Sequence, residues 1–129
     1  MKESFHVEII SPDSSVFKSE ATEVTIPSFE GQMGILKDHV PLITFLRPGV
    51  ITVKQDKGEE KFFTEDGTVE FVENNLLILS ATARTFDNLK KENIENVIKS
   101  TRELLEKDNI NDKEKYLLSY KIDTLKEIN

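Results

Sequence analysis

Residues 49–64 read Gly-Val-Ile-Thr-Val-Lys-Gln-Asp-Lys-Gly-Glu-Glu-Lys-Phe-Phe-Thr, and this stretch predicts a β-hairpin. Gly49 opens a β-branched run over 50–54, and a second run, over 61–64, contains two phenylalanines. Asp56-Lys57-Gly58 has the residue types that tight turns prefer, so the second run is expected to turn back beside the first. A β-sheet is therefore expected in the middle of the chain.

Short strand-like runs flank this hairpin on both sides. The apolar residues of 5–9 occupy alternate positions, which is the period of a half-buried strand. Further runs cover 16–18, 23–26, 68–72 and 76–79. Pro27 is expected to end the run over 23–26. The run over 76–79 is apolar on both faces, which predicts a central or fully covered strand. Many short strands with turns between them predict a β-sandwich or a flattened barrel.

The composition changes near Arg84, beyond which the chain has no Gly and no Pro. Two stripes of residues there follow helical spacing. They comprise Ile94, Val97, Ile98, Thr101, Leu104 and Leu105, and then Leu118, Ile122, Leu125 and Ile128. We expect Asp87 or Asn88 to cap the first helix, and Asn111 with Glu114 to form a capping box for the second. The connection is short, which predicts antiparallel neighbours. Helices of this length are marginal alone, so we expect a pair that depends on packing and that can detach from the sandwich.

Composition and charge exclude several classes of protein. The 129 residues suit one domain with a small appendage. With 17 basic and 24 acidic residues the net charge is −7, which argues against binding to nucleic acid or to an anionic lipid surface. There is no Cys and there are two His, so no disulfide and no metal site is predicted. No apolar run approaches the roughly 20 residues of a membrane span. Residues 1–5 do not open a signal peptide, so we expect a cytosolic chain.

The sequence lacks the motifs of nucleotide-binding and nucleophilic sites. It has no phosphate-binding glycine loop of either common type and no nucleophile elbow. Asp38-His39 is half of an acid–base relay at most, and a hydrogen-bonding structural histidine is the stronger interpretation. The pairs Glu59-Glu60 and Glu65-Asp66 fall at expected turns, where solvated carboxylates are the default. No catalytic residue and no cofactor is therefore predicted.

The densest local pattern lies over 27–42, where two Gly and two Pro surround a few apolar residues. Gly31 and Gly34 permit backbone conformations closed to other residues, and Pro27 and Pro41 fix φ. This composition predicts a pair of stiff, shaped loops at the end of the sandwich. A contact surface for another protein and a set of turns needed for folding alone explain it equally well.

Together with the residues on its C-terminal side, this segment resembles the epsilon subunit of bacterial F-type ATP synthase, which corresponds to the mitochondrial delta subunit. The matching residues are Glu30-Gly31, Gly34-Ile35, His39, Pro41-Leu42, Arg47-Pro48-Gly49, Gly67, Leu79 and Ala81-Thr82-Ala83. Residues 5–12 resemble the first strand of the family. The resemblance covers the whole chain and includes the order of strands and then helices.

The resemblance implies a sandwich of about ten short strands over 1–84 and an antiparallel two-helix hairpin over 85–129. It implies a non-catalytic rotor subunit of a proton-translocating enzyme, which sits peripherally at the cytoplasmic face of the bacterial inner membrane. The sandwich would bind the gamma subunit and the polar loops of the c-ring. By position, the residues that contact the c-ring would be Phe29, Glu30, Gly31, Gln32 and His39. Gln32 stands where members often carry an acid, so a hydrogen bond there replaces a charge pair.

In the family the hairpin can extend beside gamma into the alpha/beta head and inhibit ATP hydrolysis, which makes 85–129 a candidate regulatory arm. Some members bind ATP through (Ile/Leu)-Asp-x-x-Arg-Ala at the start of the first helix. Here Lys90 replaces the acid and Asn93 replaces the arginine, so no nucleotide site is expected. The alternatives are a stand-alone β-sandwich that binds protein or carbohydrate, and a small hydrolase. The absence of Trp and the two Tyr leave few stacking surfaces for a sugar.

Overall fold

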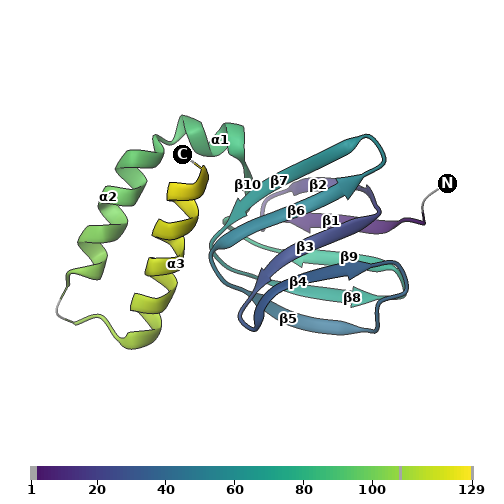
Figure 1. The fold of residues 1–129 in the computed structure, drawn as a ribbon, viewed down its shortest axis with the longest axis horizontal. Helices are drawn as coiled ribbons and strands as arrows, with labels where there is room; N and C mark the ends of the chain where they lie inside the picture. Colours follow the sequence, from purple (N-terminus) through teal and green to yellow (C-terminus); the bar gives the residue numbers. More distant parts are fainter. Residues whose placement is uncertain (1–2, 108, 129) are drawn as a thin grey trace.

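The computed structural model describes residues 3–107 and 109–128. In this part of the chain ten strands precede three helices (Figure 1). The strands are β1 (Phe5–Ile10), β2 (Ser15–Ala21), β3 (Glu23–Ser28), β4 (Gly31–Leu36), β5 (Leu42–Leu46), β6 (Gly49–Gln55), β7 (Gly58–Thr64), β8 (Gly67–Val72), β9 (Asn75–Leu79) and β10 (Arg84–Thr85). The helices are α1 (Phe86–Lys91), α2 (Ile94–Leu105) and α3 (Asp112–Ile128). The predicted order of strands and then helices is confirmed.

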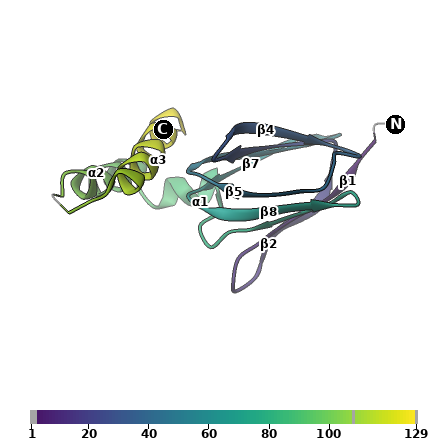
Figure 2. The ribbon, with the colours of Figure 1, turned by 90° about the horizontal axis from the view of Figure 1, so that it is seen from below.

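The strands form two layers, so the predicted sandwich is confirmed (Figure 2). One layer has the order β4-β3-β6-β7-β10, and the other has the order β5-β8-β9-β1-β2. The layers join where β3 meets β5 at the pair Ser28 and Leu46. The predicted hairpin over 49–64 is β6 and β7, paired from Gly49–Thr64 to Gln55–Gly58. β1 and β9 are parallel, and the other neighbours are antiparallel.

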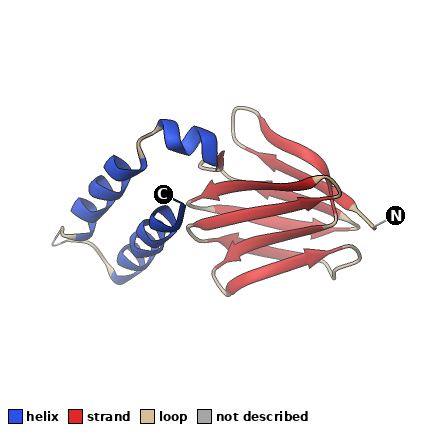
Figure 3. Cartoon of the chain, turned by 45° about the horizontal axis from the view of Figure 1, so that its top comes forward, coloured by secondary structure: helices blue, strands red, loops and turns tan. Residues whose placement is uncertain are grey.

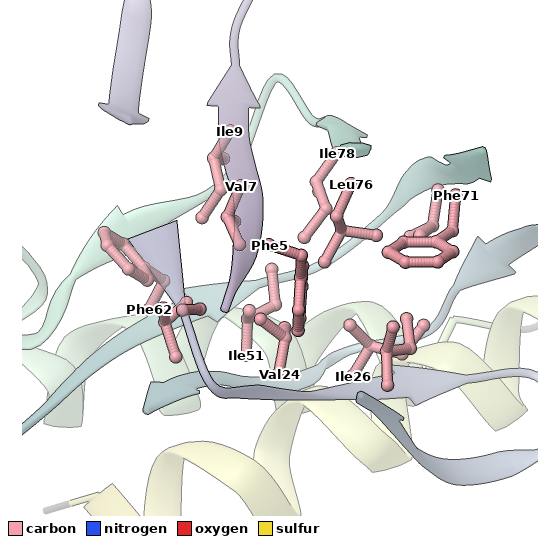
Figure 4. Packing of buried hydrophobic residues seen from close by; sticks show 14 of the residues in the cluster. Phe5, Val7, Ile9, Val24, Ile26, Ile51, Phe62, Phe71, Leu76 and Ile78 are labelled. Carbon is pink, nitrogen blue, oxygen red and sulfur yellow. The ribbon is translucent and has the colours of Figure 1, made fainter. Parts of the chain in front are cut away.

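The hydrophobic core lies between the two layers (Figure 4). Phe5, Val7 and Ile9 all point into it, as the alternation in β1 predicts. The ring of Phe5 meets that of Phe71 edge-on at 5.5 Å between centroids. Burying one such side chain stabilises the fold by about 1.5–3 kcal/mol. Every residue of this cluster comes from β1–β9 or from the segment between β9 and β10, so the sandwich has a core of its own.

The prediction that 27–42 forms two stiff loops is wrong, because β4 occupies the middle of this segment. Pro27 lies inside β3 and does not end it. Its carbonyl oxygen accepts a hydrogen bond from the Arg47 backbone N–H (2.9 Å). The nitrogen and oxygen of a strand residue face the same side, so the missing N–H of Pro27 points away from β4 and leaves their pairing intact.

Buried hydroxyl groups fix the path of the chain from β9 to the helices. Thr64 Oγ1 lies 3.0 Å from Ser80 Oγ, which accepts from the backbone N–H of Thr82 and Ala83. Thr82 Oγ1 in turn accepts from the backbone N–H of Glu65 (2.9 Å). Because these polar groups are satisfied only in this arrangement, the direction in which the chain leaves the sandwich is set.

The helical part has one more helix than the two predicted, because Asn93 interrupts it. Asn93 has a left-handed backbone (φ 60°) and caps α2 through its side chain. The short α1 is capped by Thr85, so the predicted caps Asp87 and Asn88 are wrong and lie inside the helix. The predicted capping box of α3 is present in part: Asn111 Oδ1 accepts from the Glu114 backbone N–H at 2.8 Å, and the two side chains hydrogen bond at 2.9 Å.

The helices lie at the end of the sandwich near β7 and β10 (Figures 1 and 3). They pack on β7 through Phe63, on the side of the strand opposite to Phe62 and the core. The fully buried ring of Phe63 contacts a cluster from all three helices, comprising Leu89, Ile94, Ile98, Ile122 and Leu125. The two predicted stripes are therefore confirmed as the packing faces, with two exceptions. Leu104 is exposed, and Leu118 is half-buried outside this cluster. The predicted antiparallel pair is α2 and α3, which lie side by side.

Polar contacts at the rim hold α3 to the sandwich. Glu65 forms ion pairs with Lys121 of α3 (2.7 Å) and with Arg84 (3.3 Å). The guanidinium of Arg47 lies 4.0 Å from the ring centroid of Tyr120, which is cation–π geometry. The hairpin is thus held by one buried aromatic cluster and a few charged contacts that are half-exposed.

A substitution at Gly67, the first residue of β8, tests how closely the backbones of β8 and β9 approach each other. Gly67 has a φ of 154°, and a Cβ there would lie 2.6 Å from the Leu79 carbonyl oxygen. We expect Gly67→Ala to lower the free energy of unfolding by at least about 2 kcal/mol in urea denaturation. Gly34→Ala is the matched control, since the nearest atom to its Cβ would be Glu23 Oε2 at 3.7 Å. Equal effects of the two substitutions would contradict the backbone arrangement described for Gly67.

Glu65 tests how the hairpin is held. Glu65→Gln removes the charge that pairs with Lys121 and Arg84, which destabilises the docked α3 by roughly 0.5–1 kcal/mol. Amide hydrogen exchange in α3 should therefore rise about two- to fivefold while exchange in the strands stays unchanged. Glu60→Gln, at an exposed position on β7, is the control. Unchanged α3 exchange in Glu65→Gln would mean that the apolar cluster holds the hairpin alone.

Candidate functional site

The residues expected to contact a ring of subunits fall at two separate places. Phe29 and Glu30 form the turn between β3 and β4, and Gly31 and Gln32 begin β4. His39 lies beyond the far end of β4. A strand rises about 3.3 Å per residue, so His39 lies on the order of 20 Å from the other four. The structure therefore brings four of the five candidates together and leaves His39 at the opposite end of the sandwich.

The turn that carries the four residues is rigid. Ser28 Oγ donates to the Gly31 carbonyl oxygen at 2.6 Å, and Arg47 Nε donates to the Ser28 carbonyl oxygen at 2.9 Å. Gly31 has a φ of 121°, so its glycine is required by backbone conformation. Phe29, Glu30 and Gln32 are exposed. This turn presents an aromatic ring, a carboxylate and an amide on a fixed backbone, which suits recognition of polar backbone and side chains on a partner.

His39 belongs to a second, separately fixed turn. Its Nδ1 lies 2.7 Å from the Val40 carbonyl oxygen, and its ring is edge-on to Phe71 with centroids 6.0 Å apart. Asp38 bonds to Asn74 and not to His39: its backbone N–H donates to Asn74 Oδ1 (2.7 Å) and its carboxylate accepts from Asn74 Nδ2 (2.9 Å). The pair Asp38-His39 therefore forms no acid–base relay.

The remaining titratable residues form no assembled site in the described residues. Glu65 pairs with Arg84 and Lys121, and Asp66 accepts from Thr82, while Glu59 and Glu60 are exposed. Within residues 3–107 and 109–128, no three His, Asp or Glu side chains are placed to share a metal ion.

One tyrosine on α3 has a shifted pKa. A side-chain hydrogen bond with Tyr120, and then burial, raise the pKa of Tyr116 above its usual value. Its ring meets that of Tyr120 edge-on, with centroids 4.8 Å apart.

No helix in the described part of the chain is long and apolar enough to cross a bilayer. The longest one, α3, has 17 residues, many of them charged.

An apolar outer face on the β5-β8-β9 layer is a feature that the sequence pattern did not predict. Ile43 is 75% exposed, Phe45 57% and Leu79 46%. Beside them a groove of about 790 Å³ runs between the end of this layer and the start of α3. The sequence signal that could have predicted this exposed apolar face is the pair of apolar runs over 42–46 and 76–79. The run over 76–79 was predicted to be a central or fully covered strand. The first alternative is confirmed, because β9 lies between β8 and β1. The strand is not covered on both faces, because Leu79 is exposed.

Known proteins share both the sequence and the fold. Residues 4–85 match the family model described as "ATP synthase, Delta/Epsilon chain, beta-sandwich domain". An ATP synthase epsilon chain of Pelagibacter ubique is 42% identical over 130 residues, which is 100% of both chains. An ATP synthase epsilon chain of Sinorhizobium fredii is 35% identical over 103 residues, covering 79% of this chain and 77% of the relative.

Solved structures of similar fold come from mitochondrial ATP synthases. A chain of the Euglena gracilis enzyme, described as OSCP/F1/c-ring in rotational state 1, has a TM-score of 0.74 at 15% identity and covers 95% of this chain and 78% of its own. A chain of the Tetrahymena thermophila enzyme, described as central stalk and c-ring, has a TM-score of 0.63 at 15% identity. The match covers 98% of this chain and 96% of the Tetrahymena chain. At this identity the likeness shows the fold alone. Because the family model spans the whole sandwich and one relative is 42% identical along the full length, the chain belongs to the family of ATP synthase delta/epsilon chains.

Proposed function

We propose that this chain is the epsilon subunit of a proton-translocating F-type ATP synthase. It is a non-catalytic part of the rotor, at the foot of the central stalk, and it links the gamma subunit to the c-ring. The observation that carries the proposal is the 42% identity to an epsilon chain over the full length of both proteins. The subunit then sits peripherally at the cytoplasmic face of the bacterial inner membrane, held there by its partners.

The stiffness of the sandwich supports a role in transmitting torque. A coupling element has to carry load between two partners without deforming, and close-packed interiors have low compressibility. The core spans both layers, and the turn at Phe29–Gln32 is fixed by the hydrogen bonds of Ser28 and Arg47. We propose that this turn contacts the polar loops of the c-ring, where the Gln32 amide can donate and accept hydrogen bonds.

His39 does not lie in the same contact unless the ring loops reach the other end of β4. The hydrogen bonds of Asp38 with Asn74 tie its turn to the one between β8 and β9. His39 therefore supports the sandwich in this proposal, and the ring contact is assigned to Phe29, Glu30, Gly31 and Gln32.

The hairpin over 85–129 is proposed as a regulatory arm that extends beside gamma into the alpha/beta head and slows ATP hydrolysis. Its support is the way it is attached. The sandwich keeps its own core without the helices, and the helices meet it through Phe63 and a few rim contacts. Releasing the hairpin therefore exposes one cluster and does not dismantle the sheet, which fits a two-position element.

A test of assembly and inhibition uses a cognate alpha–beta–gamma complex stripped of this subunit. We expect both the full chain and a version ending at Arg84 to co-elute with the complex, and only the full chain to slow ATP hydrolysis. Binding depends on the sandwich, and slowing depends on the hairpin. Circular dichroism of the shortened chain checks that the sandwich stays folded.

Two other outcomes would change the proposal. If both versions bind and neither slows hydrolysis, the subunit couples gamma to the ring and the hairpin is not inhibitory. If neither version binds, the rotor function is wrong, and a stand-alone protein-binding sandwich becomes the better explanation.

ATP is expected not to bind the hairpin. Lys90 carries no carboxylate, and Asn93 serves as the left-handed cap between α1 and α2, so neither supplies the acid or the guanidinium of the nucleotide motif. About 1 mM ATP should leave the thermal midpoint of the chain within about 1 °C of its value without ATP. A rise of several degrees, absent with the same concentration of pyrophosphate, would contradict this.

A further inference from the structure

We propose that Arg47 links the turn over 29–32 to the docked hairpin, so that the turn and the docked position of α3 stabilise each other. The inference rests on the proposed rotor function and adds to it a route between the two places assigned to partners. In that function the turn contacts the c-ring, and the hairpin slows ATP hydrolysis when it extends. The basis of the inference is that one side chain contacts both elements at once.

Arg47 lies between β5 and β6 and is fastened to the end of β3. Its backbone N–H donates to the Pro27 carbonyl oxygen at 2.9 Å, and its Nε donates to the Ser28 carbonyl oxygen, also at 2.9 Å. Ser28 Oγ in turn donates to the Gly31 carbonyl oxygen at 2.6 Å. The guanidinium therefore holds the residue from which the turn starts, and that residue holds the other side of the turn.

The same guanidinium lies against α3. Its central carbon is 4.0 Å from the ring centroid of Tyr120. Among the residues that the structure describes, Arg47 forms no ion pair, so no carboxylate fixes its orientation. A planar guanidinium can stack on an aromatic ring while the nitrogen atoms at its edge donate hydrogen bonds. The stacking on Tyr120 and the bond to Ser28 are therefore compatible, and each restricts the side chain to the conformation that the other needs.

The surroundings of Arg47 bring the turn and α3 to one place. Residues from both elements line a hollow of about 390 Å³ beside the arginine, and they include Gln32, Tyr120, Asp123 and Glu127. Two carboxylates of α3 thus border the same hollow as the guanidinium. The attraction between these opposite charges adds to the stacking and favours the docked position of α3.

The link acts in both directions, as any coupling between two equilibria does. When α3 leaves the sandwich, Arg47 loses the ring that restricts its side chain, so its bond to Ser28 costs more conformational entropy. A partner that binds the turn in its fixed form favours the docked α3 by the same factor. The c-ring on the turn therefore helps to hold the hairpin docked, and an extended hairpin leaves the turn looser.

Amide hydrogen exchange, measured by NMR on the isolated full chain, tests the link without any partner. The probes are the backbone N–H of Phe29, which donates to the Phe45 carbonyl oxygen at 3.2 Å, and that of Arg47. Tyr120→Leu keeps an apolar side chain on α3 and removes the aromatic ring. Exchange at both probes should rise about two- to fivefold, as expected for the loss of one cation–π contact near the surface. Exchange in β1 and β9 should stay unchanged.

Lys121→Gln is the matched control, because it also weakens the docking of α3 but leaves the stacking on Arg47 intact. Lys121 neighbours Tyr120 in the chain and pairs with Glu65 at 2.7 Å. This variant should raise exchange in α3 and leave both probes unchanged, since the hairpin stays docked in most molecules. An equal rise at the probes would mean that the turn responds to any loosening of α3, and would overturn the assignment to Arg47.

A double variant shows whether Tyr120 acts on the turn through Arg47. Arg47→Leu removes both contacts, so exchange at Phe29 should rise at least as much as it does in Tyr120→Leu. Adding Tyr120→Leu to Arg47→Leu should raise it no further, since the ring then has no guanidinium to stack on. Additive effects would overturn the link, because each side chain would then act by itself. Thermal unfolding of each variant checks its fold.

The outcomes separate this inference from the function on which it rests. The exchange measurements need no partner, so they decide on the link whether or not the chain assembles. If Tyr120→Leu leaves both probes unchanged, the link is wrong and the rotor function is untouched. If the probes respond as expected but the unchanged chain does not bind the stripped complex, the link is a property of the fold. Its route to the c-ring then fails together with the rotor function.

Discussion

A two-layer sandwich encloses only the inner face of each layer, and the apolar side chains left on its outer faces decide what else must pack against it. Phe63, on the outer face of β7, is fully covered by the chain's own helices. Phe45 and Leu79, on the outer face of the other layer, are exposed in the isolated chain. The same hydrophobic effect thus gives the hairpin its position, while the apolar side chains on the other layer stay exposed in the isolated chain.

The helices that cover Phe63 are attached to the sandwich at a few places only. The helices are covalently attached and are held by the Phe63 cluster together with the contacts of Glu65 and Arg47. The hydroxyl groups of Thr64, Ser80 and Thr82 fix the segment before the helices. A release of the hairpin would therefore begin on the C-terminal side of that segment. A sandwich with its own core, and an arm held by one aromatic cluster and a few polar contacts, is the arrangement that the proposed pairing of a stiff element with a movable one requires.

Periodicity in the sequence predicts most of the elements, and context that lies outside a local window accounts for the errors. The hairpin over 49–64, the face shared by Phe5, Val7 and Ile9, and the two helical stripes are all predicted by spacing alone.

The errors fall where distant residues matter. A proline is expected to end a strand, but whether it interrupts the pairing depends on which side its nitrogen faces. At Pro27 that side is the one where its carbonyl oxygen bonds to the distant Arg47, which no local pattern shows. Asn93 divides the helical part because it adopts a left-handed backbone, which no local spacing shows. The resemblance places the candidate ring contacts in one group, yet β4 is extended and separates His39 from Phe29. The run over 76–79 showed two apolar faces, but not whether the cover comes from this chain or from another.

The central claim is that this chain belongs to the central stalk, and that its sandwich is a unit with its own core to which the hairpin is attached as a separable arm. A cryo-EM reconstruction of the cognate enzyme with this subunit bound tests it most directly. The account predicts the sandwich on the central stalk, with the turn over 29–32 against the loops of the c-ring. A sandwich bound away from the stalk, or one with the turn over 29–32 in solvent, would contradict it.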